Sequence, residues 1–300
     1  MQNLPALEKD LFGVRKAIRA EHGNALVVAD YGQLELRLLA HLAQCQSMLH
    51  AFEVGGDFHS RTALGMYDHI KEAVSKHEVL LDYSELDDSI PDGERPPLIK
   101  DVYASERRKA KVLNFSIAYG KTEYGLSKDF GVSVEEAKDT VDRWYADRPE
   151  VLAWQEEQRR MAMQDGYVAT MLGRRRNLPN AAGRAGGGSG GRRMYNKLQG
   201  GALRAAINSP IQGSAADVAM CAMIRIHGSE ELRRLGWKLL LQVHDEVILE
   251  GPESSSQEVL ELTRQLMESP FDGLVEADHP ALSVALSVDA KTALTWYDAK

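Results

Sequence analysis

The stretch from Trp237 to Glu250 reads WKLLLQVHDEVILE, and it decides the fold of this chain. Two apolar halves rich in β-favouring residues flank His244 and Asp245, which is typical of a tight hairpin. Asp245 and Glu246 then form an acidic pair at the hairpin tip, and a Gly-Pro pair ends the second strand. Taken alone, such a pair is more often a solvated turn than a metal site.

A second carboxylate ends another apolar run. Residues 25–29 (ALVVA) are typical of a buried strand, and Asp30 follows at its carboxyl end. A turn over residues 31–33 leads into a helix over residues 34–43. An aspartate at the end of a strand is commonly just a turn residue, so this position also has an ordinary structural interpretation.

Asp30 and Asp245 together indicate a metal site more strongly than either residue does alone. Two carboxylates held on adjacent strands, with substrate phosphate oxygens and water, form the ligand set that Mg²⁺ prefers. Two such ions, about 3.5–4 Å apart, can clamp an in-line phosphoryl transfer. We therefore expect Asp30 and Asp245 to hold two Mg²⁺ ions, with Mn²⁺ as the alternative metal.

A helix expected over Ser105–Tyr119 carries a third functional pattern. Arg107, Lys111, Phe115 and Tyr119 are spaced by four residues and therefore share one helix face. Two cations followed by two aromatic rings suit a nucleoside triphosphate, which is charged at one end and flat at the other. The alternative is an amphipathic helix whose cations meet surface acids.

Composition sets limits on the class of protein. The chain has 300 residues, 44% of them hydrophobic, which is enough for a buried core. Its net charge of −8 argues against nucleic acid, but local basic runs occur at residues 107–111, 174–176 and 192–193. Uninterrupted apolar runs are too short to span a membrane, and residues 1–12 lack signal or transit patterns. We expect Cys45 and Cys221 to be buried free thiols.

Several other segments have local signatures. Ser133 and Glu136 fit a capping box that opens a helix toward Asp147, and a further helix is expected over residues 151–164. Residues 202–226 alternate in helical fashion, with Pro210 expected to break the helix. The acidic, Pro-containing residues 82–97 indicate a surface insertion, and the Gly-rich residues 183–191 indicate a mobile tip.

Three of these segments resemble the motifs of family A DNA polymerases, the bacterial DNA polymerase I class. DYGQLELR (residues 30–37) resembles motif A, RRKAKVLNFSIAYG (107–120) resembles motif B, and QVHDE (242–246) resembles motif C. The phrases ALEKD and SERRKAKVLNFSIAYGK, with the insertion at about 70–104, look most similar to plant and protist organellar members.

The resemblance implies an α+β fold. A palm, which is an antiparallel sheet with helices, would comprise residues 1–52 and 204–300. A mostly helical fingers subdomain would be inserted over residues 53–203. The thumb and exonuclease regions of the family precede motif A, so they are expected upstream in the full-length protein.

The resemblance also implies a role for each matching residue. Asp30, Asp245 and the Tyr31 carbonyl would bind metal. Lys111 would contact the triphosphate and protonate the leaving pyrophosphate, and Glu35 would block a ribose 2′-hydroxyl. The implied dNTP-binding set is His59, Arg107, Lys111, Phe115, Tyr119, Glu35 and Gln33, and the implied DNA-binding set is Arg174, Arg204, Asn208, Gln212 and His244, with Glu246 as a supporting acid.

The implied function is template-directed DNA synthesis on a primer-template, with dNTP as substrate, in organellar replication or repair. No membrane partner is expected, and the implied location is the plastid, the mitochondrion or both. Two alternatives stay open from the residues. One is a single-subunit RNA polymerase, against which Glu35 argues. The other is a weak or inactive DNA-binding fragment that lacks the thumb.

Overall fold

The computed structural model describes residues 4, 10–82, 95–182, 189–275 and 281–299. The chain forms two compact units, Met1–Glu35 with Gly213–Lys300, and Leu36–Gln212. We call the first the sheet unit and the second the helical unit. The limits of these two units fall inside helices α1 (Leu34–Ala43) and α10 (Ser189–Gly228). The palm and fingers boundaries expected at 52/53 and 203/204 stay predictions.

The sheet unit is built on a four-stranded antiparallel sheet in the order β4-β5-β1-β6. The strands are β1 (Asn24–Tyr31), β4 (Lys238–Val243), β5 (Glu246–Pro252) and β6 (Val288–Ala293). Strand β1 lies inside the sheet, which suits its unbroken run of buried residues at 25–29. The expected strand and the hairpin at 237–250 are both confirmed.

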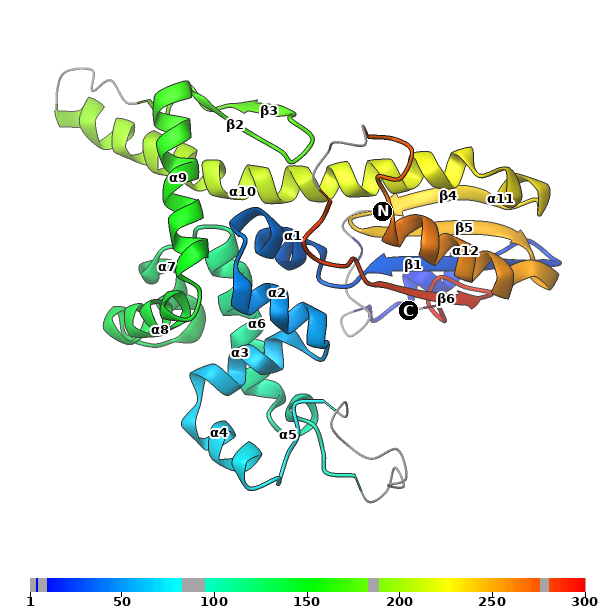
Figure 1. Ribbon diagram of the computed structural model, residues 1–300, viewed down its shortest axis with the longest axis horizontal. Coiled ribbons are helices and arrows are strands. Elements are labelled where there is room, and N and C mark those ends of the chain that lie inside the picture. Colours follow the sequence, from blue (N-terminus) through cyan, green and yellow to red (C-terminus); the bar gives the residue numbers. More distant parts are fainter. Residues whose placement is uncertain (1–3, 5–9, 83–94, 183–188, 276–280, 300) are drawn as a thin grey trace. The chain divides into compact units, whose positions relative to one another are not determined.

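The two faces of this sheet are covered differently. Helix α12 (Ser256–Glu268) packs against β1 and β6 on one face, as Figure 1 shows. A core cluster that includes Leu26, Val28, Ile248 and the fully buried Trp296 covers the other. Shorter elements complete the unit: α11 (Glu230–Arg234) and the 3₁₀ turns η2 (Val14–Ala17) and η4 (Glu253–Ser255). Burial on both faces fixes the register of β1 and β5.

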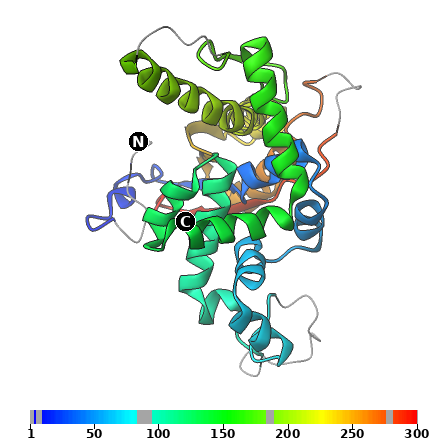
Figure 2. The same cartoon turned by 90° about the vertical axis from the view of Figure 1, so that its left-hand side faces the viewer.

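The helical unit holds most of the helices. They are α2 (Gln46–Val54), α3 (Phe58–Met66), α4 (Asp68–Ser75), α5 (Ile99–Val102), α6 (Ala104–Ala118), α7 (Glu123–Phe130), α8 (Val134–Ala146) and α9 (Pro149–Asp165). Helices α3 and α6 lie side by side in both views (Figures 1 and 2). A small hairpin of β2 (Tyr167–Ala169) and β3 (Arg175–Asn177) follows α9. The expected helices at 105–119, 133–147 and 151–164 are confirmed, as is the capping box of Ser133 and Glu136.

The expected break at Pro210 is wrong, because α10 continues through it from Ser189 to Gly228. A proline inside a helix removes one backbone hydrogen bond and crowds the preceding turn. Here Ile207 and Ile211 are fully buried on either side of it, and the Ser209 hydroxyl donates to the Ala205 carbonyl. Tertiary packing of this apolar face therefore outweighs the local preference.

The predictions for the insertion, the Gly-rich segment and the cysteines compare with the structure as follows. The insertion expected at about 70–104 includes most of α4 and all of α5. Residues 83–94, which make up most of its acidic segment at 82–97, lie outside the described part of the chain. Residues 183–188 of the expected Gly-rich tip are also outside it, and 189–191 begin α10. Cys45 and Cys221 are free and buried, as expected. Among the described residues, no helix combines the length and apolar character that a membrane span requires.

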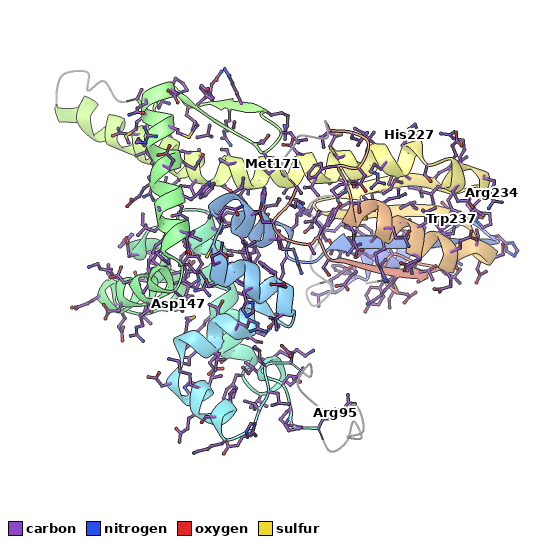
Figure 3. The ribbon with its side chains drawn as sticks, in the orientation of Figure 1. Arg95, Asp147, Met171, His227, Arg234 and Trp237 are labelled. Carbon is purple, nitrogen blue, oxygen red and sulfur yellow. The ribbon has the colours of Figure 1, made fainter. Side chains whose placement is uncertain are left out.

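Gly251 on β5 offers a test of how tightly the sheet unit is packed. A Cβ placed on Gly251 would lie 2.4 Å from Cγ of the buried Trp237, which is labelled in Figure 3. We predict that Gly251→Ala lowers the free energy of unfolding by about 1–3 kcal/mol, since overpacking forces a backbone or ring shift.

The matched control is Gly201→Ala in the middle of α10, where no atom lies within 4 Å of an added Cβ. This change should leave stability unchanged or raise it by up to about 1 kcal/mol. Chemical unfolding followed by circular dichroism measures both variants. Equal stability of Gly251→Ala and the unmodified chain would contradict the packing described for the sheet unit.

Candidate active site

Asp30 and Asp245 come together in the sheet unit, at the end where β1 meets the β4–β5 hairpin. In the β1–β5 register, Asp30 lies opposite Glu246, the residue after Asp245. The Tyr31 backbone N–H donates to the Asp245 carbonyl at 3.3 Å, which fixes the two segments to each other. The carboxyl groups of Asp30 and Asp245 are close enough for Asp30 to influence the pKa of Asp245.

The electrostatics of this pair follow from its burial. Loss of solvent raises the pKa of Asp245 above its ordinary value, and the neighbouring Glu35 carboxylate raises it further. Hydrogen bonds to its own backbone N–H and to Asp30, together with the nearby His244, act in the opposite direction. Two carboxyl groups in contact need either a shared proton or a cation, because two bare negative charges would repel.

The donor chemistry of this pair fits a hard divalent cation. Carboxylate and backbone carbonyl oxygens are the ligands that Mg²⁺ takes, and it retains several water or phosphate oxygens. No group of three or more His, Cys, Asp or Glu side chains in the described residues is placed to hold a metal.

Hydrogen bonds from neighbouring side chains hold the strand ends that carry the carboxylate pair. Glu246 is 2% exposed, and its Oε1 accepts a hydrogen bond of 2.7 Å from the indole N–H of Trp296. The Tyr31 hydroxyl donates to the Met267 carbonyl of α12 at 2.7 Å, which anchors the end of β1 to the helix. His244 occupies the left-handed backbone region at the hairpin turn, with φ of 58°. Trp296 was not identified from the sequence, since no local pattern links it to position 246.

The helical unit presents the expected stripe on α6. Arg107, Phe115 and Tyr119 are half-buried and Lys111 is exposed. The Phe115 and Tyr119 rings are 6.0 Å apart between centroids, and the His59 ring of α3 lies 5.8 Å from Phe115. The stripe therefore has a cationic end and an aromatic end, and α3 adds an imidazole to it.

Arg107 is held by a residue that the sequence did not indicate. Asp57 caps the start of α3 by accepting from the Ser60 backbone N–H, and it binds the Arg107 guanidinium through both carboxylate oxygens, at 2.5 and 2.9 Å. Burial alone would raise the pKa of Asp57, but the Arg107 and Ser60 donors outweigh it and lower the pKa. A planar two-point pair of this kind fixes the orientation of the guanidinium.

His59 is buried beside this ion pair, at 3% exposure. Its Nδ1 lies 3.1 Å from the side-chain amide nitrogen of Asn114. Burial lowers the pKa of His59 to about 4; Arg107 and Lys111 also lower it, and Asp57 partly opposes them. His59 is therefore a neutral imidazole at physiological pH.

The remaining candidate residues fall on three elements. Arg204, Asn208 and Gln212 are one turn apart on α10, with Arg204 and Gln212 exposed and Asn208 half-buried. Arg174 is exposed in the turn between β2 and β3. Glu35 lies in the first turn of α1, just after Gln33, which has a positive φ of 57°.

Comparison with known proteins covers nearly the whole chain. The model of the family described as DNA polymerase family A matches residues 1–78 and 96–298. DNA polymerase I B, chloroplastic/mitochondrial, of Arabidopsis thaliana is 56% identical over all of this chain and 27% of its own length. DNA polymerase I A, chloroplastic, of Oryza sativa subsp. japonica is 54% identical over the same shares.

Bacterial proteins and a solved structure are similar as well. DNA polymerase I of Streptococcus pneumoniae is 36% identical over the whole of this chain and 29% of its own length. The solved POL domain of Pol1 from M. smegmatis, in complex with DNA primer-template and dNTP, superposes with a TM-score of 0.78 at 30% identity. It covers all of this chain and 45% of the other.

The chain thus spans between a quarter and a third of the length of these curated relatives. The family match extends across both the sheet unit and the helical unit and includes all three motif segments. The α+β fold expected from the resemblance agrees with the solved polymerase domain. We conclude that the chain belongs to family A of the DNA polymerases.

Proposed function

We propose that this chain carries out template-directed DNA synthesis, transferring a nucleotide from a dNTP to a primer 3′-hydroxyl. The observation that carries the proposal is that the β1–β5 register and the Tyr31–Asp245 backbone hydrogen bond bring Asp30 and Asp245 next to each other. Family membership supports it, since the relatives are named as DNA polymerases.

The sheet unit would hold the metal ions. Asp30 and Asp245, with the Tyr31 carbonyl, would bind two Mg²⁺ ions, or Mn²⁺ in their place. When bound, these ions lower the pKa of the attacking hydroxyl and neutralise charge on the phosphoryl group and the leaving group. Glu246 and Trp296 would keep the hairpin end of β5 rigid beneath the pair through their hydrogen bond.

The helical unit would hold the nucleotide. Arg107, Lys111 and His59 would donate to phosphate oxygens, while Phe115 would pack on the sugar and Tyr119 beside the templating pair. The primer oxygen forms a new bond to the α-phosphorus as the bond to pyrophosphate breaks, and Lys111 would give a proton to that leaving group. Such a reaction depends mostly on positioning and charge stabilisation.

The proposed DNA contacts are carried over from the motifs that this chain shares with family A DNA polymerases. Arg204, Asn208 and Gln212 would contact the minor groove of the new duplex, where the acceptors common to all correct pairs report pair shape. Arg174 would bind backbone phosphates, His244 would lie beside the primer end, and Gln33 beside the incoming nucleotide. The partners of the chain would therefore be primer-template DNA and dNTP.

The cellular role would be replication or repair of organellar DNA. The plant relatives are named as chloroplastic or mitochondrial enzymes, and they are 52–56% identical to this chain. We infer a plastid or mitochondrial location from that similarity. The thumb and exonuclease regions would lie in the part of the relatives' length that this chain does not match.

Primer extension tests the metal assignment most simply. Asp245→Ala should reduce extension of a primed template by on the order of 10³-fold or more, since preorganised charge stabilisation dominates this chemistry. Glu258→Ala, an exposed carboxylate on α12, is the matched control and should extend normally. Extension that survives Asp245→Ala would refute the assignment, and extension by no variant would favour a DNA-binding fragment.

Metal removal should change stability as well as activity. The folded pKa of Asp245 is raised, so the stability it contributes is present at acid pH and lost as the pH rises through that pKa. At pH 7.5 without divalent ions, Asp245→Asn should therefore unfold at a higher temperature than the unmodified chain.

Adding Mg²⁺ should reverse this order. At about 100 times its Kd, Mg²⁺ should stabilise the unmodified chain by about 2.7 kcal/mol. The Asp245→Asn variant should respond much less, because it lacks one carboxylate ligand. Thermal unfolding with Mg²⁺, and with NaCl at equal ionic strength, measures this; an identical Mg²⁺ response in both proteins would be incompatible with a shared metal site.

Selection against ribonucleotides should depend on Glu35. Removing its carboxylate by Glu35→Ala would open the space that a 2′-hydroxyl needs, so the ratio of ribonucleotide to deoxynucleotide incorporation should rise at least tenfold, which is about 1.4 kcal/mol. Single-nucleotide extension with matched rNTP and dNTP gives the ratio. Glu53→Ala on α2 is an exposed acidic control, and an unchanged ratio in Glu35→Ala would count against this role.

A further inference from the structure

Asn114 of α6 is at the centre of a buried polar network that joins three helices. Its side chain is fully buried, and it contacts His59 and Thr62 of α3 and Trp144 of α8. Trp144 and Thr62 are each 3% exposed. A fully buried amide needs partners for all of its polar atoms, so the orientation of this network is strongly constrained.

The indole of Trp144 sets the orientation of the Asn114 amide. An indole N–H can only donate, and it lies 2.8 Å from Oδ1 of Asn114. The amide oxygen of Asn114 must therefore face Trp144, and its amide nitrogen must face His59 and Thr62. The orientation of the Asn114 amide therefore follows from the Trp144 indole, because an indole N–H can bond only to an oxygen acceptor here.

The Asn114 nitrogen then has two hydrogens and two acceptors. One is the Thr62 hydroxyl oxygen at 3.0 Å, and Thr62 in turn donates to the Phe58 carbonyl at 3.1 Å. The other is Nδ1 of His59 at 3.1 Å. Because the Asn114 nitrogen can only donate, Nδ1 of His59 must accept and cannot carry a proton.

We propose that Asn114 and Trp144 are positioning residues that hold His59 as the neutral Nε2–H tautomer, with Nε2 aimed at a nucleotide phosphate as a hydrogen-bond donor. Within the described part of the chain, Nε2 has no hydrogen-bond partner. The phosphate part of this proposal rests on the proposed function, whereas the tautomer depends on the network alone.

The charges around His59 support a neutral donor. Asp57, at the start of α3, is already paired with Arg107, and Lys111 lies one turn further along α6. Burial, together with Arg107 and Lys111, lowers the pKa of His59 to about 4, and Asp57 partly opposes this shift. Two full cations are thus available on α6, while the imidazole adds a directional donor whose strength does not change between about pH 5.5 and 8.

Nuclear magnetic resonance of the ¹⁵N-histidine-labelled chain reads the tautomer directly. The His59 signals, assigned by their loss in His59→Gln, should show a protonated Nε2 and an unprotonated Nδ1 throughout pH 5.5–8. A protonated Nδ1, or an imidazolium at pH 7, would overturn the proposal. This measurement needs no variant of the network, so it stands even if Asn114 variants fold poorly.

Asn114→Asp tests the consequence for the nucleotide. The introduced carboxylate cannot donate, so it would accept from the Trp144 indole and from a proton on Nδ1 of His59. At pH 5.5 the imidazole should then be doubly protonated and still donate from Nε2. At pH 8 it should be the neutral tautomer with its proton on Nδ1, so that Nε2 presents a lone pair to the phosphate instead of a hydrogen.

We expect the ratio of variant to unmodified Kd for dATP, measured by equilibrium dialysis, to be near one at pH 5.5. It should rise about tenfold by pH 8, as expected for the loss of one hydrogen bond to a charged group. The phosphate groups of dATP also titrate in this range, but they affect both proteins equally, so the ratio of the two Kd values removes their contribution. In a His59→Gln background, Asn114→Asp should lose this pH dependence.

A ratio that is constant across the pH range, or a pH dependence that survives in the His59→Gln background, would overturn the positioning role. Absence of dATP binding by the unmodified chain would instead refute the proposed function and the phosphate donor with it. The resonance measurement would still decide the tautomer in that case.

Discussion

The structure depends on one constraint, which is that two acidic side chains meet where β1 and the β4–β5 hairpin end. The register of β1 against β5 brings Asp30 beside Asp245, although most of the chain separates them in sequence. The two central strands, β1 and β5, are buried on both faces, so neither can slip without exposing core residues. The fold thereby keeps two mutually repelling carboxyl groups close together, and under the proposed function a divalent cation would offset that repulsion.

In the helical unit, two candidate side chains are likewise held in fixed positions by buried or half-buried partners. Arg107 is held by Asp57, and His59 is held by Asn114, through side-chain hydrogen bonds. Asp57 is half-buried and Asn114 is buried, so both partners are held in place by the packing around them. If the proposed function is right, this stretch of the helical unit is already ordered for its nucleotide. The cap of α3 by Asp57 is also part of this arrangement, because the carboxylate that starts the helix fixes the cation of α6.

Local patterns predicted the elements well, and long-range contacts account for what they missed. The strand at 25–29, the hairpin at 237–250 and the stripe on α6 each follow from periodicity, and the resemblance supplied roles for single residues within them. The Glu246–Trp296 bond, the Asp57–Arg107 pair and the Asn114 network join residues far apart in sequence, so no spacing reveals them. Pro210 was misjudged because buried Ile207 and Ile211 hold the helix together through tertiary packing.

A double-mutant cycle of divalent-ion binding tests whether Asp30 and Asp245 hold the same metal ions. Mn²⁺ affinity would be measured by paramagnetic resonance for the unmodified chain, Asp30→Asn, Asp245→Asn and the double variant. If both carboxylates hold the same ions, each single change should weaken binding nearly as much as the double change does. Losses that simply add, or Mn²⁺ binding that is indifferent to either substitution, would contradict a shared site.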